Sequence, residues 1–146
     1  MFVSETYELE DCIKYYSTDR SSDSTVNLTL PNDYIITWNT SRTGTGGSFI
    51  RIGNNNNNAL AIGTIGSNGM SGLWENVNGN WAYQYDNGTI SNGNHTYEIT
   101  MSNGTVTFKL DSTTTSSSSI SVNINNFLGY YVNSANKMKN FKIKPL

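Results

Sequence analysis

Apolar and polar residues alternate along much of this chain of 146 residues. The clearest example runs from residue 95 to residue 110, where Asn103-Gly104 separates two alternating stretches. Period-two alternation places every second side chain on the same face of a strand, and an Asn-Gly pair favours a two-residue turn. This segment therefore predicts a β-hairpin with one buried face.

Similar short stretches, separated by Gly, Asn and Pro, predict about eleven strands in total. Outside the hairpin they cover 25–30, 34–38, 48–53, 59–63, 72–77, 81–85, 119–124, 127–132 and 138–146. Many short strands with turn residues between them are typical of a β-sandwich or barrel. We therefore expect an all-β fold, an antiparallel two-sheet β-sandwich. The alternation predicts that its core includes Val26, Leu28, Ile99, Val106, Phe108, Leu110, Val122 and Ile143.

Three segments depart from the strand pattern. Residues 5–16 leave a helix open as an alternative, the run Asn54–Asn58 predicts a turn or loop, and 111–119 predicts a polar linker. Strand patterns continue on both sides of the last two, so neither marks a domain boundary. We expect a single domain over residues 1–146, with 1–24 assigned to it less firmly, or a piece of a longer fibre or surface protein.

The surface is expected to be polar without being charged. Charged residues make up 14% of the chain and the net charge is −2, whereas Asn, Ser and Thr number 22, 18 and 17. The basic cluster at 137–144 is too small for the Lys/Arg footprint of nucleic-acid binding. Without an apolar run of about 20 residues, we expect no membrane insertion. The single cysteine, Cys12, excludes an intrachain disulfide and is interpreted as a small buried apolar residue.

The order of several segments resembles a known superfamily. The segments are "LPNDYIITW", "FIRIG", "HTYEITMSNGTVTFKLD", "FLGYY" and "KMKNFKIKPL". Over residues 25–146 the chain resembles the concanavalin A-like lectin/glucanase superfamily, in particular its laminin-G-like and phage-associated members. The resemblance implies a jelly-roll sandwich with a structural role for His95. It also implies the settings of such domains: phage tail fibres, cell-surface adhesins and carbohydrate-binding modules.

Candidate catalytic and metal-binding residues are sparse. Glucanases of the superfamily carry paired carboxylates on one strand, but "YELED" at 7–11 lacks that spacing, and Glu75 and Glu98 stand alone on their strands. We therefore expect that the chain is not an enzyme. No cofactor is expected either; calcium is kept as an alternative at Asp33, Asp86 or Asp111.

The hairpin predicted over 72–88 is the candidate binding site. A two-residue turn at Asn78-Gly79 makes Asn76 face Trp81 and Trp74 face Tyr83. Aromatic rings can stack on sugar rings while amides bind hydroxyl groups. The candidate ligand-binding residues are Trp74, Asn76, Trp81, Tyr83, Gln84, Tyr85, Asp86 and Asn87. The alternative is that these aromatics are core, in which case Glu75 and Gln84 are the exposed residues of the sheet.

These observations favour a non-catalytic glycan-binding or receptor-binding module of a phage tail fibre or cell-surface adhesin. The expected partner is a cell-surface or cell-wall polysaccharide, with homo-oligomerisation through a parent fibre. The expected location is a virion or the cell surface. The alternative is a structural or assembly domain of a virion or surface fibre that binds no small ligand.

Overall fold

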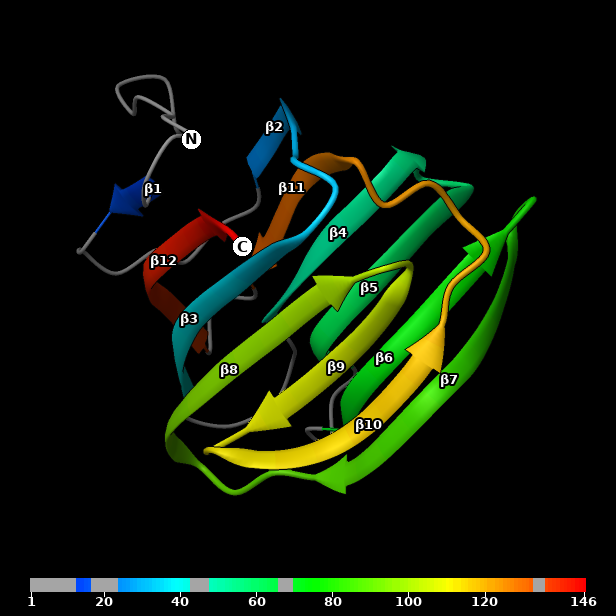
Figure 1. The fold of residues 1–146 in the computed structure, drawn as a ribbon. Helices are drawn as coiled ribbons and strands as arrows, with labels where there is room; N and C mark the ends of the chain where they lie inside the picture. The colour runs from blue at the N-terminus through cyan, green and yellow to red at the C-terminus, as the bar shows by residue number, and fades with distance from the viewer. Residues whose placement is uncertain (1–12, 17–23, 43–47, 66–69, 133–135) are drawn as a thin grey trace.

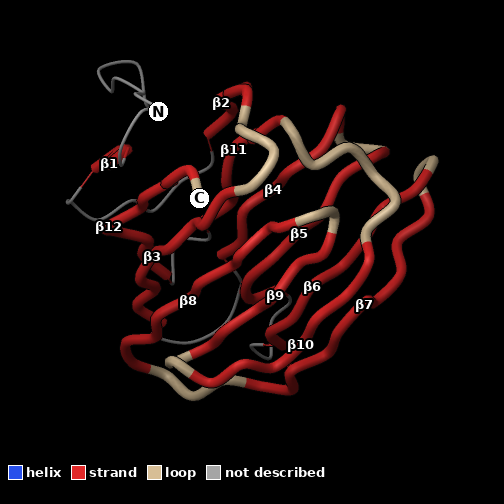
Figure 2. Tube along the Cα trace, viewed as in Figure 1, coloured by secondary structure: helices blue, strands red, loops and turns tan. Residues whose placement is uncertain are grey.

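The predicted all-β, two-sheet antiparallel sandwich is confirmed. The structure, a computed structural model, describes residues 13–16, 24–42, 48–65, 70–132 and 136–146, and these form strands and connections without a helix (Figure 1 and Figure 2). Two six-stranded sheets stack face to face. Both the predicted sandwich and its antiparallel pairing follow from short alternating strands joined by tight turns.

Each sheet combines strands that are distant in the sequence. In order across it, sheet A contains β1 (Ile13–Tyr16), β12 (Asn136–Pro145), β3 (Tyr34–Arg42), β8 (Gly93–Ser102), β9 (Thr105–Leu110) and β10 (Thr113–Ser119). Sheet B contains β2 (Ser24–Thr29), β11 (Asn126–Val132), β4 (Ser48–Asn55), β5 (Asn58–Ile65), β6 (Met70–Val77) and β7 (Asn80–Thr89). The last strand of the chain, β12, thus lies between β1 and β3 (Figure 1).

Two strand assignments made from the sequence were wrong. Thr113–Ser119, predicted as a linker, forms the edge strand β10 and pairs with β9. Asp111 and Ser112 make the turn between these strands with φ values of 51° and 69°, so this two-residue hairpin turn contains no glycine to signal it. Conversely, residues 120–125 form the connection between the sheets, although 119–124 was predicted as a strand.

The helix alternative for residues 5–16 is wrong for the part that the structure describes. Ile13–Tyr16 forms strand β1, which pairs with β12 at the edge of sheet A. Residues 5–12, including Cys12, lie outside the described residues.

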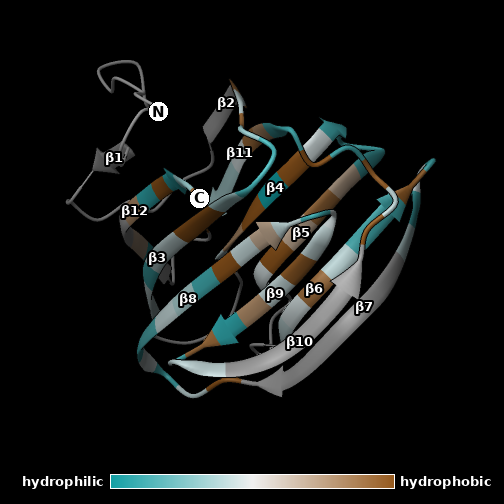
Figure 3. Cartoon of the chain, viewed as in Figure 1, coloured by the Kyte–Doolittle hydropathy of each residue, from teal (hydrophilic) through white to brown (hydrophobic). Residues whose placement is uncertain are grey.

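Most of the predicted core is confirmed. Ile99, Val106, Phe108, Leu110, Val122 and Ile143 are buried, and Leu28 packs half-buried against them. The side chain of Val26 lies outside the described part. Brown bands alternate with white or teal ones along strands such as β8 and β9 in Figure 3, as period-two burial requires.

The core also contains polar groups that join the two sheets. The hydroxyl of Tyr97 on sheet A contacts the hydroxyls of Thr64 and Ser71 on sheet B, the latter at 3.0 Å. Burial raises the pKa of Tyr97, so the phenol stays protonated and able to donate. These bonds satisfy hydroxyls that would otherwise be buried without partners.

Candidate functional site

The hairpin of β6 and β7 has the predicted turn and, at its tip, the predicted register. Asn78 and Gly79 both have positive φ, and Asn76 pairs with Trp81 and Trp74 with Tyr83. Further along, a bulge interrupts the ladder, so Tyr85 pairs with Leu73 where an unbroken hairpin would place Gln84. The bulge therefore ends the continuous row of side chains that strict alternation predicts on this face of the hairpin.

The structure separates the predicted site residues into buried and exposed ones. Trp74 and Asn76 are buried, with 7% and 2% of their surface exposed, whereas Trp81 is 53% exposed. The side chains of Tyr83, Gln84, Tyr85, Asp86 and Asn87 lie outside the described part of the structure. Among the described members of the predicted row, Trp81 is therefore the aromatic ring that a ligand can reach.

Glu75 is buried. The alternative in which the aromatics are core expected it to be exposed, and that expectation is wrong. Glu75 Oε2 accepts hydrogen bonds from the Ser121 amide (3.0 Å), the Ser121 hydroxyl (2.8 Å) and the Val122 amide (3.0 Å). The carboxylate thereby holds the connection between β10 and β11 against sheet B. The sequence did not indicate this, because Ser121 lies 46 residues away along the chain.

Trp74, Asn76 and Trp81 belong to the outer face of sheet B. Leu73 points into the core, so the alternation places Trp74 and Asn76 on the opposite, outer face. On neighbouring β5 the outward residues are Ala59 and Ala61, which pair with Asn76 and Trp74. One strand further, Arg51 pairs with Ala61. Ala59 and Ala61 are each only 1% exposed, so this part of the outer face is not open to solvent.

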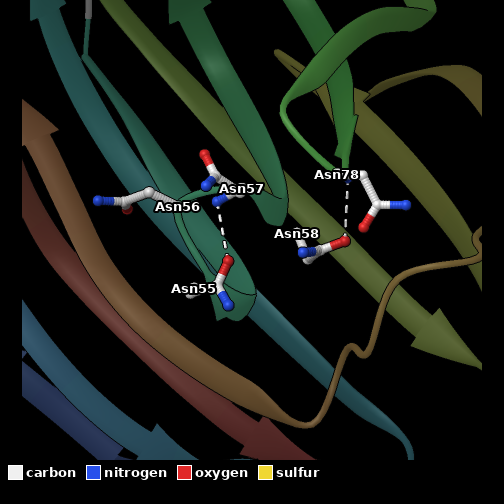
Figure 4. Close-up of a pocket in the computed structure, with 5 residues that line it drawn as sticks. All are labelled: Asn55, Asn56, Asn57, Asn58 and Asn78. Atoms are coloured by element: carbon white, nitrogen blue, oxygen red, sulfur yellow. Dashed lines mark hydrogen bonds between the residues drawn. The ribbon is translucent and has the colours of Figure 1, made fainter.

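Asparagines join the tip of this hairpin to the β4–β5 turn. Asn76 Nδ2 donates to the Asn56 carbonyl (2.7 Å), the Asn78 amide to Asn58 Oδ1 (3.1 Å), and the Gly79 amide to the Asn57 carbonyl (3.0 Å). An open hollow of about 510 Å³ lies between the two tips, lined by Asn55, Asn56, Asn57, Asn58 and Asn78 (Figure 4). The predicted turn at Asn54–Asn58 is confirmed, and its position beside the hairpin was not predicted.

Arg51 brings a positive charge beside this hollow. Its Nη1 donates to Asn56 Oδ1 at 3.1 Å. Arg51 Nε and Asn76 Oδ1 are both buried without a hydrogen-bond partner in the part of the chain that the structure describes. One is a donor and the other an acceptor, and both side chains hold Asn56. Sequence reasoning missed Arg51 because only the sheet order brings β4 near the hairpin.

A second cluster combines Ser91, His95 and Asp111. His95 Nδ1 lies 2.7 Å from Asp111 Oδ2, and Nε2 lies 2.8 Å from the Ser91 carbonyl and 3.5 Å from the Ser91 hydroxyl. A carbonyl oxygen only accepts, so Nε2 carries a proton and has no lone pair to take one from Ser91. The cluster therefore ties the residues before β8 to the end of β9, consistent with the structural role expected for His95.

The surroundings of Asp111 lower the pKa of its carboxyl group. Partial burial alone would raise its pKa, but hydrogen bonds from His95 and the Thr96 amide, together with the charge of His95, lower it overall. The Thr96 amide donates to Asp111 Oδ1 at 2.9 Å. These bonds also hold Asp111 in its positive-φ turn conformation.

Among the described residues, no three His, Cys, Asp or Glu side chains gather as a metal site would require. Asp33 Oδ1 instead accepts a hydrogen bond from the Asn103 amide at 3.1 Å. The part of the chain described here contains no helix long and apolar enough to cross a membrane.

Comparison with known proteins gives a fold and no family. No protein-family model and no curated protein sequence matches the chain. Among solved structures, the carbohydrate-binding module CBM66 from Bacillus subtilis matches with a TM-score of 0.64 and 12% identity, covering 94% of this chain and 98% of that chain. Galectin LEC-6 from Caenorhabditis elegans matches with a TM-score of 0.66 and 7% identity, covering 94% and 99%.

A third match is to part of a larger protein. The GH43 protein BlXynB from Bacillus licheniformis matches with a TM-score of 0.65 and 10% identity over 91% of this chain, which spans 32% of that chain. These likenesses show that the chain has the lectin/glucanase-like β-sandwich fold.

Proposed function

We propose that this chain is a non-catalytic glycan-binding module whose site lies on the outer face of sheet B around Trp81. The observation that carries the proposal is the exposure of Trp81, at 53%, on the same face as Arg51 and on the hairpin whose turn residue Asn78 lines the hollow. A flat aromatic ring offers a stacking surface to the C–H face of a sugar. Amide groups beside it hydrogen-bond to hydroxyls.

The buried atoms Arg51 Nε and Asn76 Oδ1 support the same site. Both lack a partner among the described residues. A buried donor and a buried acceptor without partners are each costly, and a hydroxyl can satisfy both kinds because it accepts and donates. Because both atoms lie beneath the surface, a buried water fits each of them, and such a water can form a further hydrogen bond to a sugar hydroxyl above it.

Two of the structural neighbours support this proposal. One is a carbohydrate-binding module and one a galectin, and both align over nearly their whole length. The proposal that the chain is not an enzyme rests on its own carboxylates. Glu75 is held by three hydrogen bonds, and Glu98 Oε2 lies 3.3 Å from Lys109 Nζ. Neither is therefore placed as one of a catalytic pair.

A structural or assembly domain is the second candidate. Val77 and Trp81 are both exposed at the end of the β6–β7 hairpin, at 38% and 53%. A subunit interface would cover such exposed apolar side chains. Either role suits a module of a phage tail fibre, a virion or a cell-surface adhesin, where repeated copies raise avidity for a polysaccharide.

Titration of cell-wall and capsular polysaccharides with the purified protein tests the proposal. We expect Trp81→Ala to weaken binding about tenfold or more while the thermal midpoint stays unchanged, because the stacking surface is lost. Binding of a neutral glycan should also change little between low and high salt.

Val77→Ala, on the same hairpin, is the matched control and should bind as the wild type does. Wild-type binding that survives Trp81→Ala would overturn the proposed site. A protein that binds no polysaccharide but whose oligomeric state is shifted by Trp81→Ala would instead favour the assembly role.

A further inference from the structure

We infer that the asparagine-lined hollow between the β4–β5 and β6–β7 turns is a subsite for a carboxylate carried by the glycan. The inference rests on the proposed function, since it assigns part of the ligand of the same surface. It depends on counting which hydrogen-bonding groups of the five lining asparagines are already used by the protein.

The amide orientations of three lining residues are fixed by their partners. Asn55 Oδ1 accepts from the Asn57 amide (2.9 Å), Asn56 Oδ1 from Arg51 Nη1 (3.1 Å) and Asn58 Oδ1 from the Asn78 amide (3.1 Å). Backbone N–H and guanidinium groups only donate, so the atom facing each must be the amide oxygen. The Nδ2 group of each of these three amides therefore takes no part in these hydrogen bonds.

Three of the five side-chain amide oxygens that line the hollow are already used, whereas none of the five Nδ2 groups is used by another described residue, so unused donors outnumber unused acceptors. The backbone carbonyls of Asn56 and Asn57 accept from Asn76 Nδ2 and the Gly79 amide. The Nδ2 groups of Asn55, Asn56 and Asn58 have no hydrogen-bond partner among the described residues. Asn55, Asn56 and Asn57 are exposed and Asn58 is half-buried, so these donors are within reach of a ligand.

A surplus of unused donors favours a ligand that accepts hydrogen bonds and brings no donor of its own. A hydroxyl brings its own hydrogen, which needs an acceptor, whereas a carboxylate only accepts and offers about four lone-pair sites. The Arg51 guanidinium polarises the Asn56 amide, which strengthens its Nδ2 as a donor. All five lining residues are uncharged, so no carboxylate in the lining repels an anion. Hydrogen bonds to an ionised acceptor are the stronger kind.

The two turns that border the hollow are held together by contacts within the protein. Three hydrogen bonds tie the two turns together, as described above, and Figure 4 shows two of the amide oxygens engaged within the cluster. At Gly53, opposite Ala59, an added Cβ would lie 2.2 Å from the Asn58 carbonyl oxygen, so only glycine permits this close approach. A preformed site saves the entropic cost of ordering loops on binding.

Nuclear magnetic resonance of the ¹⁵N-labelled full chain tests the inference with glucuronate and glucose as probes. The two sugars differ at C6, which is a carboxylate in one and a hydroxymethyl group in the other. At neutral pH and matched ionic strength, we expect glucuronate to shift the side-chain amide signals of Asn55, Asn56 and Asn58. Glucose should shift them far less.

Asn58→Asp is the decisive variant. Aspartate keeps the oxygen that accepts from the Asn78 amide but replaces the outward donor by a negative charge, so the fold is retained and glucuronate affinity should fall about tenfold or more. Asn94→Asp, an exposed position in β8, makes the same charge change as a control and should bind as the wild type does. Equal shifts with glucose, no shift with glucuronate, or unchanged binding by Asn58→Asp would overturn the inference.

The same spectra separate this inference from the proposed function. The indole N–H signal of Trp81 reports on sugar stacking, and the asparagine amides report on the hollow. Trp81 signals that respond to both sugars, with silent asparagine amides, would leave the glycan-binding proposal standing and remove the carboxylate subsite. Silence of both sets at all sugar concentrations would count against both.

Discussion

Phe108 belongs to a row of aromatic rings that crosses the core face of sheet A. Its ring lies 5.7 Å from that of Tyr97, which lies 5.1 Å from Trp38, and Trp38 lies 6.2 Å from Phe141. These residues come from four adjacent strands and are all buried. Stacked rings at such spacings add to the stabilisation that burial alone gives.

Truncation of this row should be costly. We expect Phe108→Ala to lower the free energy of unfolding by about 3–5 kcal/mol, since it removes buried apolar surface and leaves a cavity. Urea denaturation followed by tryptophan fluorescence measures it. Trp81→Ala removes an exposed ring and serves as the control, with a change near zero. A loss below about 1 kcal/mol for Phe108→Ala would show that the ring is not packed as described.

Trp74 and Trp81 differ in whether a ligand can reach them. Both are tryptophans on one face of one hairpin, yet one is 7% and the other 53% exposed. Trp74 lies inside the sheet, next to Ala61 on one side and Tyr83 on the other, whereas Trp81 lies on the edge strand β7. An edge strand has no neighbour to cover its outer side chains, so Trp81 remains available to a ligand.

At the scale of elements, Glu75 connects β6 to the segment that links the two sheets. That segment crosses from β10 in sheet A to β11 in sheet B, and its residues Ser121 and Val122 donate three hydrogen bonds to one carboxylate oxygen. Tyr34 holds the same segment from sheet A, donating to the Ile124 carbonyl at 2.8 Å. The connection is therefore fixed from both sheets.

Removal of the Glu75 carboxylate should loosen this connection. Glu75→Ala leaves donors without an acceptor, each costing about 1–3 kcal/mol when buried, whereas Glu75→Gln keeps one acceptor oxygen and should cost less. Hydrogen exchange of the Ser121 and Val122 amides should become faster in both variants. Glu98→Gln, which disturbs only the surface pair with Lys109, is the control and should leave those amides protected. Unchanged exchange in Glu75→Ala would contradict the assigned role.

The whole molecule carries few charges, so its stability should depend on few titrations. The chain has 11 acidic residues and one histidine, and Asp111 is the described carboxyl group whose pKa is lowered. A carboxyl group with a lowered folded-state pKa stabilises the native state above its unfolded pKa, near about 4. It loses that contribution as the pH falls through the folded value.

Comparison of the wild type with Asp111→Asn isolates this contribution. We expect the wild type to be more stable at neutral pH and the difference to shrink as the pH falls below about 4. The effect should be small, because the Asp111 side chain is 48% exposed and solvent screens its charge. Urea midpoints at several pH values measure it. A difference that stays constant across the range would show that the carboxylate charge plays no part.

The sequence alone determined the sandwich, most of its core and both predicted Asn-Gly turns. Each of these depends on neighbours within a few residues: alternation sets which face is buried, and Asn-Gly sets the two-residue turn. The register that pairs Asn76 with Trp81 follows from the turn in the same way. The predicted strand at 119–124 was wrong, and β10 was missed, because both depend on which polar segments find a strand partner.

Only the tertiary structure decided which side of the predicted site is open and what lies beside it. The order β4-β5-β6-β7 places Arg51 and the Asn54–Asn58 turn next to the hairpin, and β7 at the edge exposes Trp81. Glu75 was buried by a segment 46 residues further along the chain. The alternation along one strand determines which side chains share a face. Long-range pairing determines which other strands and connections cover that face, and alternation along a single strand carries no information about it.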